Sequence, residues 1–293
     1  MSTIAVILPV YNVRPYLRAA LDSLLAQSVR DWTAVCVDDG STDGSGDILD
    51  EYAARDGRFR VIHQANGGVS AARNAGLDSV TEEVVTFMDP DDTVGPEWLS
   101  RLLEGVRGVD LAWGGARTVC DGRLGKDGPR DIGACYEGLA LRRRVWRAIF
   151  GYRLRDLVWM AFPGGMWRHC RRELGSTCWR AFRRDVIGDL RFNTEVRLYE
   201  DSLFLAAYAL RAKTMRVIGD TGYLYEIRPT GAMSTEARER LVASKFALRD
   251  ARRAIDPAMT QWRGSFLLSA VEIMRSAGFR TAWRYVRNGR VRD

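Results

Sequence analysis

The 293-residue chain lacks the features that mark several classes of protein. No apolar run reaches the ~20 residues that are needed to cross a bilayer. The N-terminus has no basic segment followed by a long apolar stretch and a cleavage site. The five cysteines are odd in number and form no CxxC pair, which argues against a zinc site. We therefore expect a reduced, cytoplasmic protein.

Two nucleotide-binding patterns are also missing. The first apolar stretch continues as Leu8-Pro9-Val10-Tyr11-Asn12, without the GxGxxG of dinucleotide oxidoreductases, so that class is discarded. The stretch from Pro9 to Pro15 has neither Gly nor Lys, which counts against a sugar nucleotidyltransferase with a Gly-rich triphosphate loop. No aromatic–Gly RNA-binding pattern is evident, so we expect no nucleic-acid partner. The nucleotidyltransferase and a basic nucleic-acid-binding protein remain the alternatives.

The composition is that of a soluble globular protein with a core of adequate size. Apolar residues make up 46% of the chain and charged residues 28%. The formal net charge is +7. A basic balance of this kind indicates an anionic partner, such as a nucleotide, a nucleic acid or an acidic membrane face.

Up to about residue 115 the pattern alternates between strands and helices. Such alternation predicts βαβ units and a mostly parallel sheet. The expected strands are Ile4–Leu8, Trp32–Val37, Phe59–Ile62 and Val84–Met88, and the expected helices are Arg14–Gln27, Ser45–Arg55, Val69–Asp78 and Pro96–Val106.

Beyond residue 115 the pattern weakens. We expect a loop or irregular strands over residues 115–130, a helix over Glu200–Ala212, and strands over Thr214–Ile218 and Tyr223–Ile227. Amphipathic helices and a basic tail follow from about residue 234. The predicted units are residues 1–115, 116–235 and 236–293.

Acidic clusters follow two of the predicted strands. These clusters are Asp38-Asp39 and Asp89-Pro90-Asp91-Asp92. Acids at the downstream ends of parallel strands collect on one edge of the sheet, where open α/β sheets bind ligands. Carboxylates together with diphosphate oxygens suit Mg²⁺ or Mn²⁺. The alternative for each cluster is a solvated turn that caps the next helix.

Two other segments carry candidate chemistry. The glycines of Asn66-Gly67-Gly68 precede an Ala-rich helix that contains Arg73, which suits the close approach of an anion. Glu200-Asp201 opens another helix, where an acid is either a general base or a favourable charge in the first turn. Taken alone, the first segment also fits a Gly-rich loop with no ligand, and the second fits a helix whose first turn carries acids.

Together, in this order, the segments resemble family 2 glycosyltransferases of the GT-A fold, of the type that assembles bacterial polysaccharide and lipopolysaccharide. The resemblance extends to about residue 235. It is carried by Ile7-Leu8-Pro9-Val10-Tyr11-Asn12, Val37-Asp38-Asp39-Gly40-Ser41-Thr42-Asp43, Asn66-Gly67-Gly68 through Ala72-Arg73-Asn74-Ala75-Gly76, Phe87-Met88-Asp89-Pro90-Asp91-Asp92 and Tyr199-Glu200-Asp201. It implies a Rossmann-like, mostly parallel sheet with helices on both faces, and a C-terminal helical acceptor-side region.

The resemblance also implies a role for each matching residue. Pro9, Tyr11 and Asp39 would form the nucleobase pocket. Asn66, Gly68 and Arg73 would border the nucleoside and diphosphate, with Asp89 near the ribose. Asp91, with Asp92 beside it, would hold the metal, and Asp201 would be the catalytic base. Arg228 and Ser234 would touch the diphosphate from a closing loop.

The implied reaction moves a sugar from a nucleotide-diphosphate donor, UDP-linked by resemblance, to a hydroxyl of a glycan or lipid-linked acceptor, with inversion at the anomeric carbon. Mn²⁺ or Mg²⁺ would be the cofactor. Some family members add a His near the base as a third protein ligand. Neither His63 nor His169 matches that position, so the metal would rely on fewer protein ligands.

The segment 139–184 combines many arginines with four of the nine tryptophans, Trp146, Trp159, Trp167 and Trp179. Basic residues with tryptophan suit the interface of an anionic membrane, which would place the protein on the inner face of the cell membrane. The alternative is a helical subdomain that packs its tryptophans inward and leaves its arginines solvated.

Overall fold

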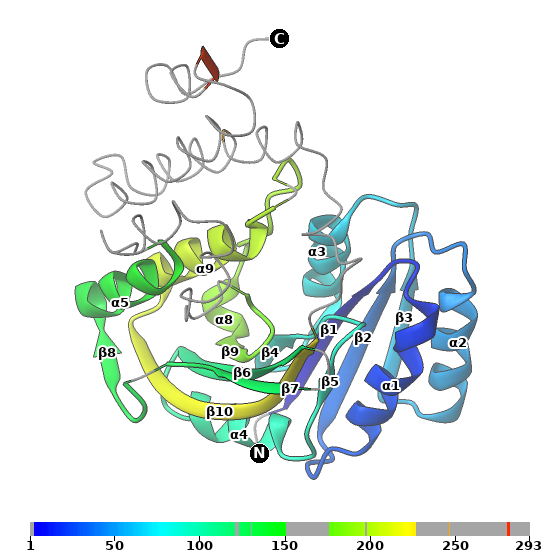
Figure 1. The fold of residues 1–293 in the computed structure, drawn as a ribbon, viewed down its shortest axis with the longest axis horizontal. Helices are drawn as coiled ribbons and strands as arrows, with labels where there is room; N and C mark the ends of the chain where they lie inside the picture. The colour runs from blue at the N-terminus through cyan, green and yellow to red at the C-terminus, as the bar shows by residue number, and fades with distance from the viewer. Residues whose placement is uncertain are drawn as a thin grey trace.

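The structure, a computed structural model, describes residues 3–120, 123–129, 131–150, 176–196 and 198–226, together with the single residues 246, 280 and 281. Within these residues the chain forms a 10-stranded sheet (Figure 1). Its order is β3-β2-β1-β4-β9-β6-β10-β5, and β7 pairs with β6 while β8 pairs with β10. The sheet matches the α/β class that the alternating pattern predicts.

The strands and helices have the following bounds. The strands are β1 Ile4–Val10, β2 Trp32–Asp38, β3 Phe59–His63, β4 Val84–Phe87, β5 Thr93–Val94, β6 Leu111–Cys120, β7 Arg123–Asp127, β8 Cys135–Glu137, β9 Arg180–Arg183 and β10 Thr214–Glu226. The helices are α1 Arg14–Leu25, α2 Ser45–Arg55, α3 Val69–Ser79, α4 Trp98–Val106, α5 Gly138–Phe150, α8 Arg184–Ile187 and α9 Glu200–Arg211.

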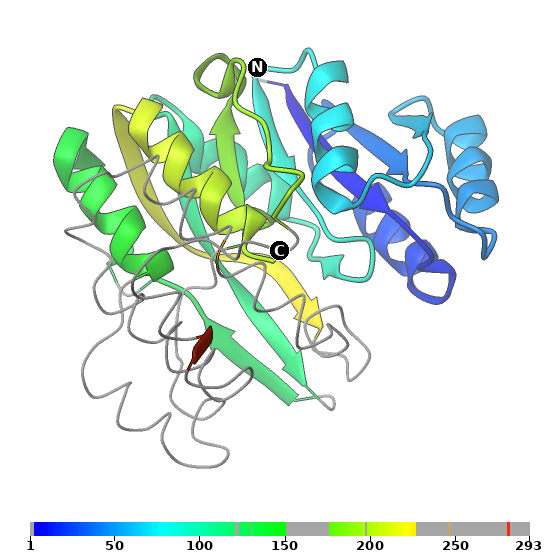
Figure 2. The ribbon, with the colours of Figure 1, turned by 90° about the horizontal axis from the view of Figure 1, so that it is seen from above.

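The first half of the sheet is parallel, as predicted. β1 pairs in parallel with β2 and with β4, and β2 pairs in parallel with β3. Every residue of β1 is buried, because α1 and α2 cover one face of these strands and α3 covers the other (Figures 1 and 2). Continuous apolar runs are typical of strands that are covered on both faces. The four strands predicted here agree with the structure to within two residues.

The second half of the sheet is mixed, and here the sequence predictions need correction. β9 is antiparallel to both β4 and β6 and joins the two halves. β6 extends to residue 120 and pairs with β7 where a loop or irregular strands were expected. β10 is one strand instead of two, and its pairing with β6 shifts register between Val217 and Tyr223. Extra residues in a register shift bend a strand without ending it.

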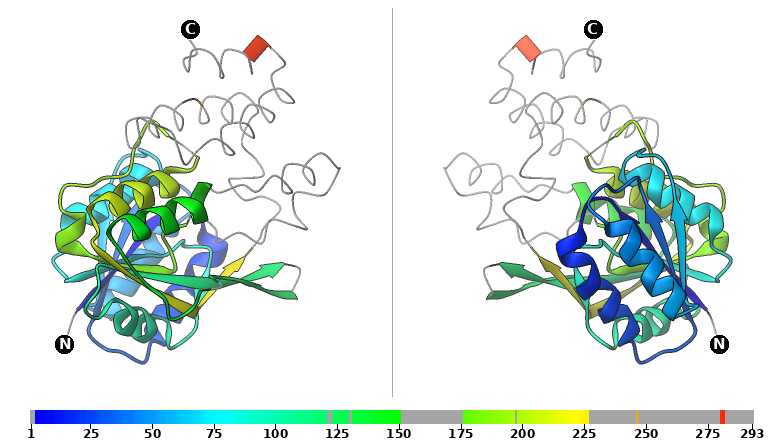
Figure 3. Two further views of the ribbon diagram at one scale, coloured as in Figure 1. Left: turned by 90° about the vertical axis from the view of Figure 1, so that its left-hand side faces the viewer. Right: turned by 90° about the vertical axis from the view of Figure 1, so that its right-hand side faces the viewer.

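Helices enclose the second half from both sides (Figure 3). α4 lies on the same face as α1, whereas α5 and α9 lie on the face of α3. Trp146 is 8% exposed and Trp179 is 3% exposed, so both pack into the core. Trp159, Trp167 and the predicted C-terminal amphipathic helices lie outside the described residues. Among the helices that the structure describes, none is long and apolar enough to span a membrane.

Candidate active site

The two predicted acidic clusters meet at one edge of the sheet. β1 lies between β2 and β4, so the ends of all three strands are neighbours. Val10 is opposite Asp38 across the β1–β2 pair. The N–H of Met88 donates to the carbonyl of Ile7 at 3.0 Å, which fixes the end of β4 against β1. This edge is where ligands bind in open α/β sheets.

Asp39 is held by the glycine loop that precedes α3. Its Oδ1 accepts hydrogen bonds from the Gly67 N–H at 2.9 Å and from Nε2 of Gln64 at 2.7 Å. Its Oδ2 accepts from the Gly68 N–H at 2.8 Å. Gly68 has a φ of +88°, a conformation that favours glycine and turns the loop toward the carboxylate. The sequence analysis identified Asp39 and Gly68 but missed Gln64.

Pro9 and Tyr11, predicted for the nucleobase pocket, lie at the same edge, as does Asn66, which was predicted to border the nucleoside and diphosphate. Pro9 is buried in β1, whereas Asn66 is exposed and Tyr11 is 50% exposed. The backbone of Gly40 passes so close to this loop that an added Cβ would lie 3.0 Å from the nitrogen of Asn66. The edge therefore presents an exposed aromatic ring and an amide beside the buried carboxylate of Asp39.

Asp38 stabilises the turn that follows β2. Its carboxylate accepts a hydrogen bond from the Ser41 N–H at 2.9 Å and contacts Nδ1 of His63 at 2.9 Å. Nε2 of His63 contacts Asp50 at 3.1 Å. Burial acts to raise the pKa of Asp38, but the hydrogen bonds from Ser41 and His63 outweigh it and leave that pKa lowered. The bonds to Asp38 and then to Asp50 raise the pKa of His63.

Arg73 is a buried cation that gathers three carboxylates from distant parts of the chain. Its side chain is 4% exposed. Nη1 donates to Asp201 at 2.7 Å and to Glu200 at 2.9 Å, and Nη2 donates to Asp89 at 3.1 Å. Asp89 follows β4, and the two other acids open α9, so this cluster joins the two halves of the sheet.

Burial sets the proton affinities in this cluster. It raises the pKa of Glu200 to about 7, with a further contribution from the charge of Asp201. Burial also raises the pKa of Asp201, against the opposing charge of Arg73. For Arg73 the three acids outweigh burial and raise its pKa, so it stays charged. A carboxylate with a raised pKa beside a fixed cation suits the role of a general base.

Neighbouring side chains that the sequence analysis missed orient this cluster. Thr177, which is fully buried, directs its N–H and its hydroxyl toward the Asp201 carboxylate, each at 3.3 Å. The side chain of Asn74 forms hydrogen bonds with both the N–H and the carbonyl of Phe192, at 2.7 and 2.9 Å. The guanidinium of Arg73 lies 5.3 Å from the centre of the Phe192 ring. Arg73 is thus held by packing as well as by charge.

The acids of the Asp89–Asp92 turn have different surroundings. Asp91 is partly exposed. Asp92 is 1% exposed, and its oxygens accept hydrogen bonds from the Tyr223 hydroxyl at 2.7 Å and from the Glu226 N–H at 2.9 Å. Burial, together with the charges of Asp89 and Asp91, raises the pKa of Asp92 to about 8.

The turn fits a divalent cation with few protein ligands. Over the part of the chain that the structure describes, no group of three or more His, Cys, Asp or Glu residues has the arrangement of a metal centre. Burial raises the pKa of Asp92 most, and repulsion from the carboxylates of Asp89 and Asp91 raises it further. Oxygen donors at such a place suit Mg²⁺ or Mn²⁺ that also binds phosphate oxygens.

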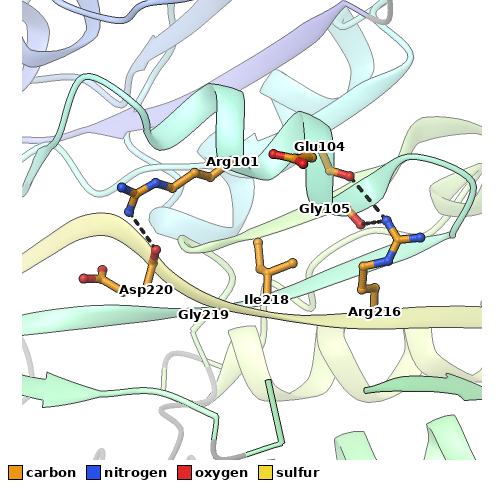
Figure 4. Close-up of a pocket in the computed structure, with 7 residues that line it drawn as sticks. All are labelled: Arg101, Glu104, Gly105, Arg216, Ile218, Gly219 and Asp220. Carbon is orange, nitrogen blue, oxygen red and sulfur yellow. Dashed lines mark hydrogen bonds between the residues drawn. The ribbon is translucent and has the colours of Figure 1, made fainter. Parts of the chain in front are cut away.

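Arg228 and Ser234, the predicted diphosphate contacts, lie outside the described residues. A separate open cavity of about 410 Å³ lies between α4 and β10, on the face opposite α9 (Figure 4). Arg101 and Arg216 line it, but each donates to main-chain carbonyls, of Asp220 and of Glu104 and Gly105 respectively. We therefore assign no ligand to this cavity.

Comparison with known proteins shows which protein family the chain matches. Residues 5–171 match the family model described as Glycosyl transferase family 2. The chain is 32% identical over 229 residues to the uncharacterized glycosyltransferase EpsJ of Bacillus subtilis, which covers 77% of this chain and 61% of EpsJ. The chain thus spans about three fifths of that relative.

Solved structures share the fold. The complex of S. aureus TarS with UDP-GlcNAc has a TM-score of 0.64 at 18% identity and covers 99% of this chain and 93% of that chain. The mannosyltransferase PcManGT from Pyrobaculum calidifontis, in complex with GDP-Man and Mn²⁺, has a TM-score of 0.60 at 16% identity. The match covers 99% of this chain and 76% of that chain. At such identities the similarity establishes the architecture alone.

Proposed function

Because the chain belongs to glycosyl transferase family 2, we propose that it transfers a sugar from a nucleotide-diphosphate donor to a hydroxyl group of an acceptor. The preferred donor class is UDP-sugar, since the matching TarS structure binds UDP-GlcNAc. The acceptor class is a glycan or a lipid-linked glycan, as the resemblance in the sequence implies. Transfer inverts the anomeric carbon, because a single displacement needs no covalent intermediate.

The observation that carries this proposal is the cluster of Asp89, Glu200 and Asp201 on the buried guanidinium of Arg73. The acceptor oxygen forms a bond to the anomeric carbon while the bond from that carbon to the diphosphate oxygen breaks. Asp201 takes the proton that the acceptor hydroxyl loses, and the departing nucleoside diphosphate keeps the electron pair. Thr177 and Arg73 hold the Asp201 carboxylate in place for this transfer.

The proposed diphosphate site is the turn from Asp89 to Asp92. Asp91 is the proposed metal ligand of this turn, with Asp92 beside it. When bound there, Mn²⁺ or Mg²⁺ neutralises the charge that develops on the leaving diphosphate. Asp89 lies near the ribose, and its hydrogen bond to Arg73 keeps it next to the catalytic base, Asp201. Arg228 and Ser234 remain proposed contacts to the diphosphate.

The nucleobase lies at the carboxyl ends of β1 and β2. Asp39 accepts hydrogen bonds from the base, and the ring of Tyr11 provides a surface for stacking. Asp39 already accepts bonds from Gly67 and Gly68, so base binding adds to, or replaces, bonds from this loop. We place the reaction in the cytoplasm, at the face of the membrane where lipid-linked acceptors are presented.

A donor screen tests the proposal. The purified protein is incubated with Mn²⁺ and, one at a time, UDP-, GDP- and dTDP-sugars, and release of the nucleoside diphosphate is measured. We expect slow hydrolysis of one UDP-sugar, abolished by EDTA and restored by Mn²⁺. Release from GDP-sugars alone would change the donor assignment, and release from no donor, with no binding of any of them, would reject the proposal.

A further inference from the structure

Tyr223 lies under the acidic turn in a position that packing fixes. The residue is fully buried on β10. The rings of Trp98 and Trp179 contact it edge-on, with centroids 5.8 and 5.5 Å away. The backbone of Tyr223 pairs with Val94 of β5, the strand that directly follows the turn. A ring enclosed on several sides has one place for its hydroxyl group, because a change of rotamer would require its neighbours to move.

That hydroxyl bonds to both ends of the turn. It accepts a hydrogen bond from the Asp89 N–H at 3.0 Å and donates one to Oδ2 of Asp92 at 2.7 Å. The other oxygen of Asp92 accepts from the Glu226 N–H at 2.9 Å, at the end of β10. The turn closes on itself through a bond from the Asp92 N–H to the Asp89 carbonyl at 3.2 Å. Asp91 lies between the two residues that are fixed in this way.

We propose that Tyr223 is the positioning residue of the metal-binding turn, and that Asp92 acts as its buried partner while Asp91 supplies the metal-binding oxygen. This inference rests on the proposed function. Both oxygens of Asp92 are directed to protein donors, whereas a metal-binding carboxylate must direct an oxygen to the ion. A cation held by few protein ligands depends on the fixed position of each ligand, because movement of the turn costs affinity.

Tyr208 provides a matched control. It is also a fully buried tyrosine, and its hydroxyl also accepts one backbone N–H, from Arg183 at 3.1 Å. The hydroxyl donates to backbone carbonyls, at 2.6 Å to that of Asp110 and at 3.4 Å to that of Arg183. Its hydroxyl touches none of the acids of the turn. Tyr208→Phe and Tyr223→Phe therefore remove equivalent buried hydroxyl groups, and only one of them supports the turn.

The test measures Mn²⁺ binding by the whole chain in the presence of UDP, from the loss of the free-ion electron paramagnetic resonance signal. We expect Tyr223→Phe to weaken Mn²⁺ binding about tenfold, a change within the range for a buried polar group that loses its hydrogen-bond partner. Tyr208→Phe should bind within about twofold of the wild type, although both variants lower the melting temperature. Equal Mn²⁺ affinity of Tyr223→Phe and the wild type would overturn the inference alone. A wild type that binds neither Mn²⁺ nor UDP would overturn the proposed function with it.

A second measurement needs no variant. Hydrogen–deuterium exchange at single amides reports whether the turn is fixed before metal arrives. We expect the Asp89 and Glu226 amides to exchange as slowly in the metal-free protein as the amide of Met88, which bonds to β1. Fast exchange at these two amides until Mn²⁺ and UDP are added would show that the ligands, and not Tyr223, order the turn.

Discussion

Replacement of Arg73 by methionine tests the role of the buried cation. Methionine keeps much of the length and apolar surface of the side chain but removes its charge. Three carboxylates, at 2.7, 2.9 and 3.1 Å from the guanidinium, then lose their common partner. Removing one partner of a buried ion pair costs about 3–5 kcal/mol, because the remaining charge is left uncompensated. We expect a loss of stability in this range above neutral pH.

The size of this loss depends on pH. The folded-state pKa of Glu200, about 7, exceeds its unfolded value, so its contribution to stability is fully present in acid and is lost as the pH rises through that pKa. Arg73 lowers the pKa of both Glu200 and Asp201, so its removal raises both pKa values further. At about pH 5, below the raised pKa of Glu200, this carboxyl group of the variant is protonated and needs no cation, so the deficit is smaller there and grows toward about pH 8.

Urea unfolding at about pH 5 and about pH 8 measures this difference. Arg58→Met is the control, because Arg58 forms a pair with Asp56 at 2.7 Å in which each side chain is about a quarter exposed. The hydrogen bonds from Arg58 hold the pKa of Asp56 at about 2, so Asp56 stays ionised at both pH values. We expect the control to lose about 1 kcal/mol or less at each pH, since solvent screens such pairs. A loss from Arg73→Met that is the same at both pH values would refute the reasoning.

Two further predictions concern the turn and the histidine. Asp91→Ala should weaken Mn²⁺-dependent UDP binding about tenfold or more, because it removes the proposed metal-binding oxygen. Calorimetry with Mn²⁺ and with EDTA checks this, and an unchanged affinity with Mn²⁺ would contradict the assignment. His63, whose pKa is raised by Asp38 and Asp50, contributes stability below its unfolded pKa that is lost as the pH rises through the folded value. His63→Gln should remove that pH dependence from the melting temperature, and superimposable curves for variant and wild type would count against it.

The sequence predicted the first half of the fold well, because its strands are covered on both faces. β1 is an unbroken apolar run for this reason, and β4 is buried throughout with Thr86 as its one polar residue. The second half was harder. β9 reads Arg180-Ala181-Phe182-Arg183, and its first arginine is fully buried, so neither composition nor alternation marks a strand there. Two strands were predicted in place of β10, because the register shift through which it continues as one strand is a tertiary property that the local pattern does not show.

For the site, the sequence identified the acids but not their partners. Arg73 and Asp201 are 128 positions apart, and no local pattern shows that they share a hydrogen bond. Thr177 lies in a segment where arginine and tryptophan dominate, and it carries no motif of its own. The hydroxyl of Tyr223 reaches Asp92 across 131 positions. Such contacts depend on how β9 and β10 pair within the sheet. The local sequence pattern does not predict that pairing.

In the proposed reaction Asp201, held by Arg73, accepts the proton of the acceptor hydroxyl. The most direct measurement compares Asp201→Asn with the wild type, using the donor that the screen identifies. We expect the affinity for the nucleotide-sugar to stay within about twofold, while turnover falls by roughly 10²–10⁴-fold because the amide accepts no proton. Turnover of the variant close to that of the wild type would contradict the account.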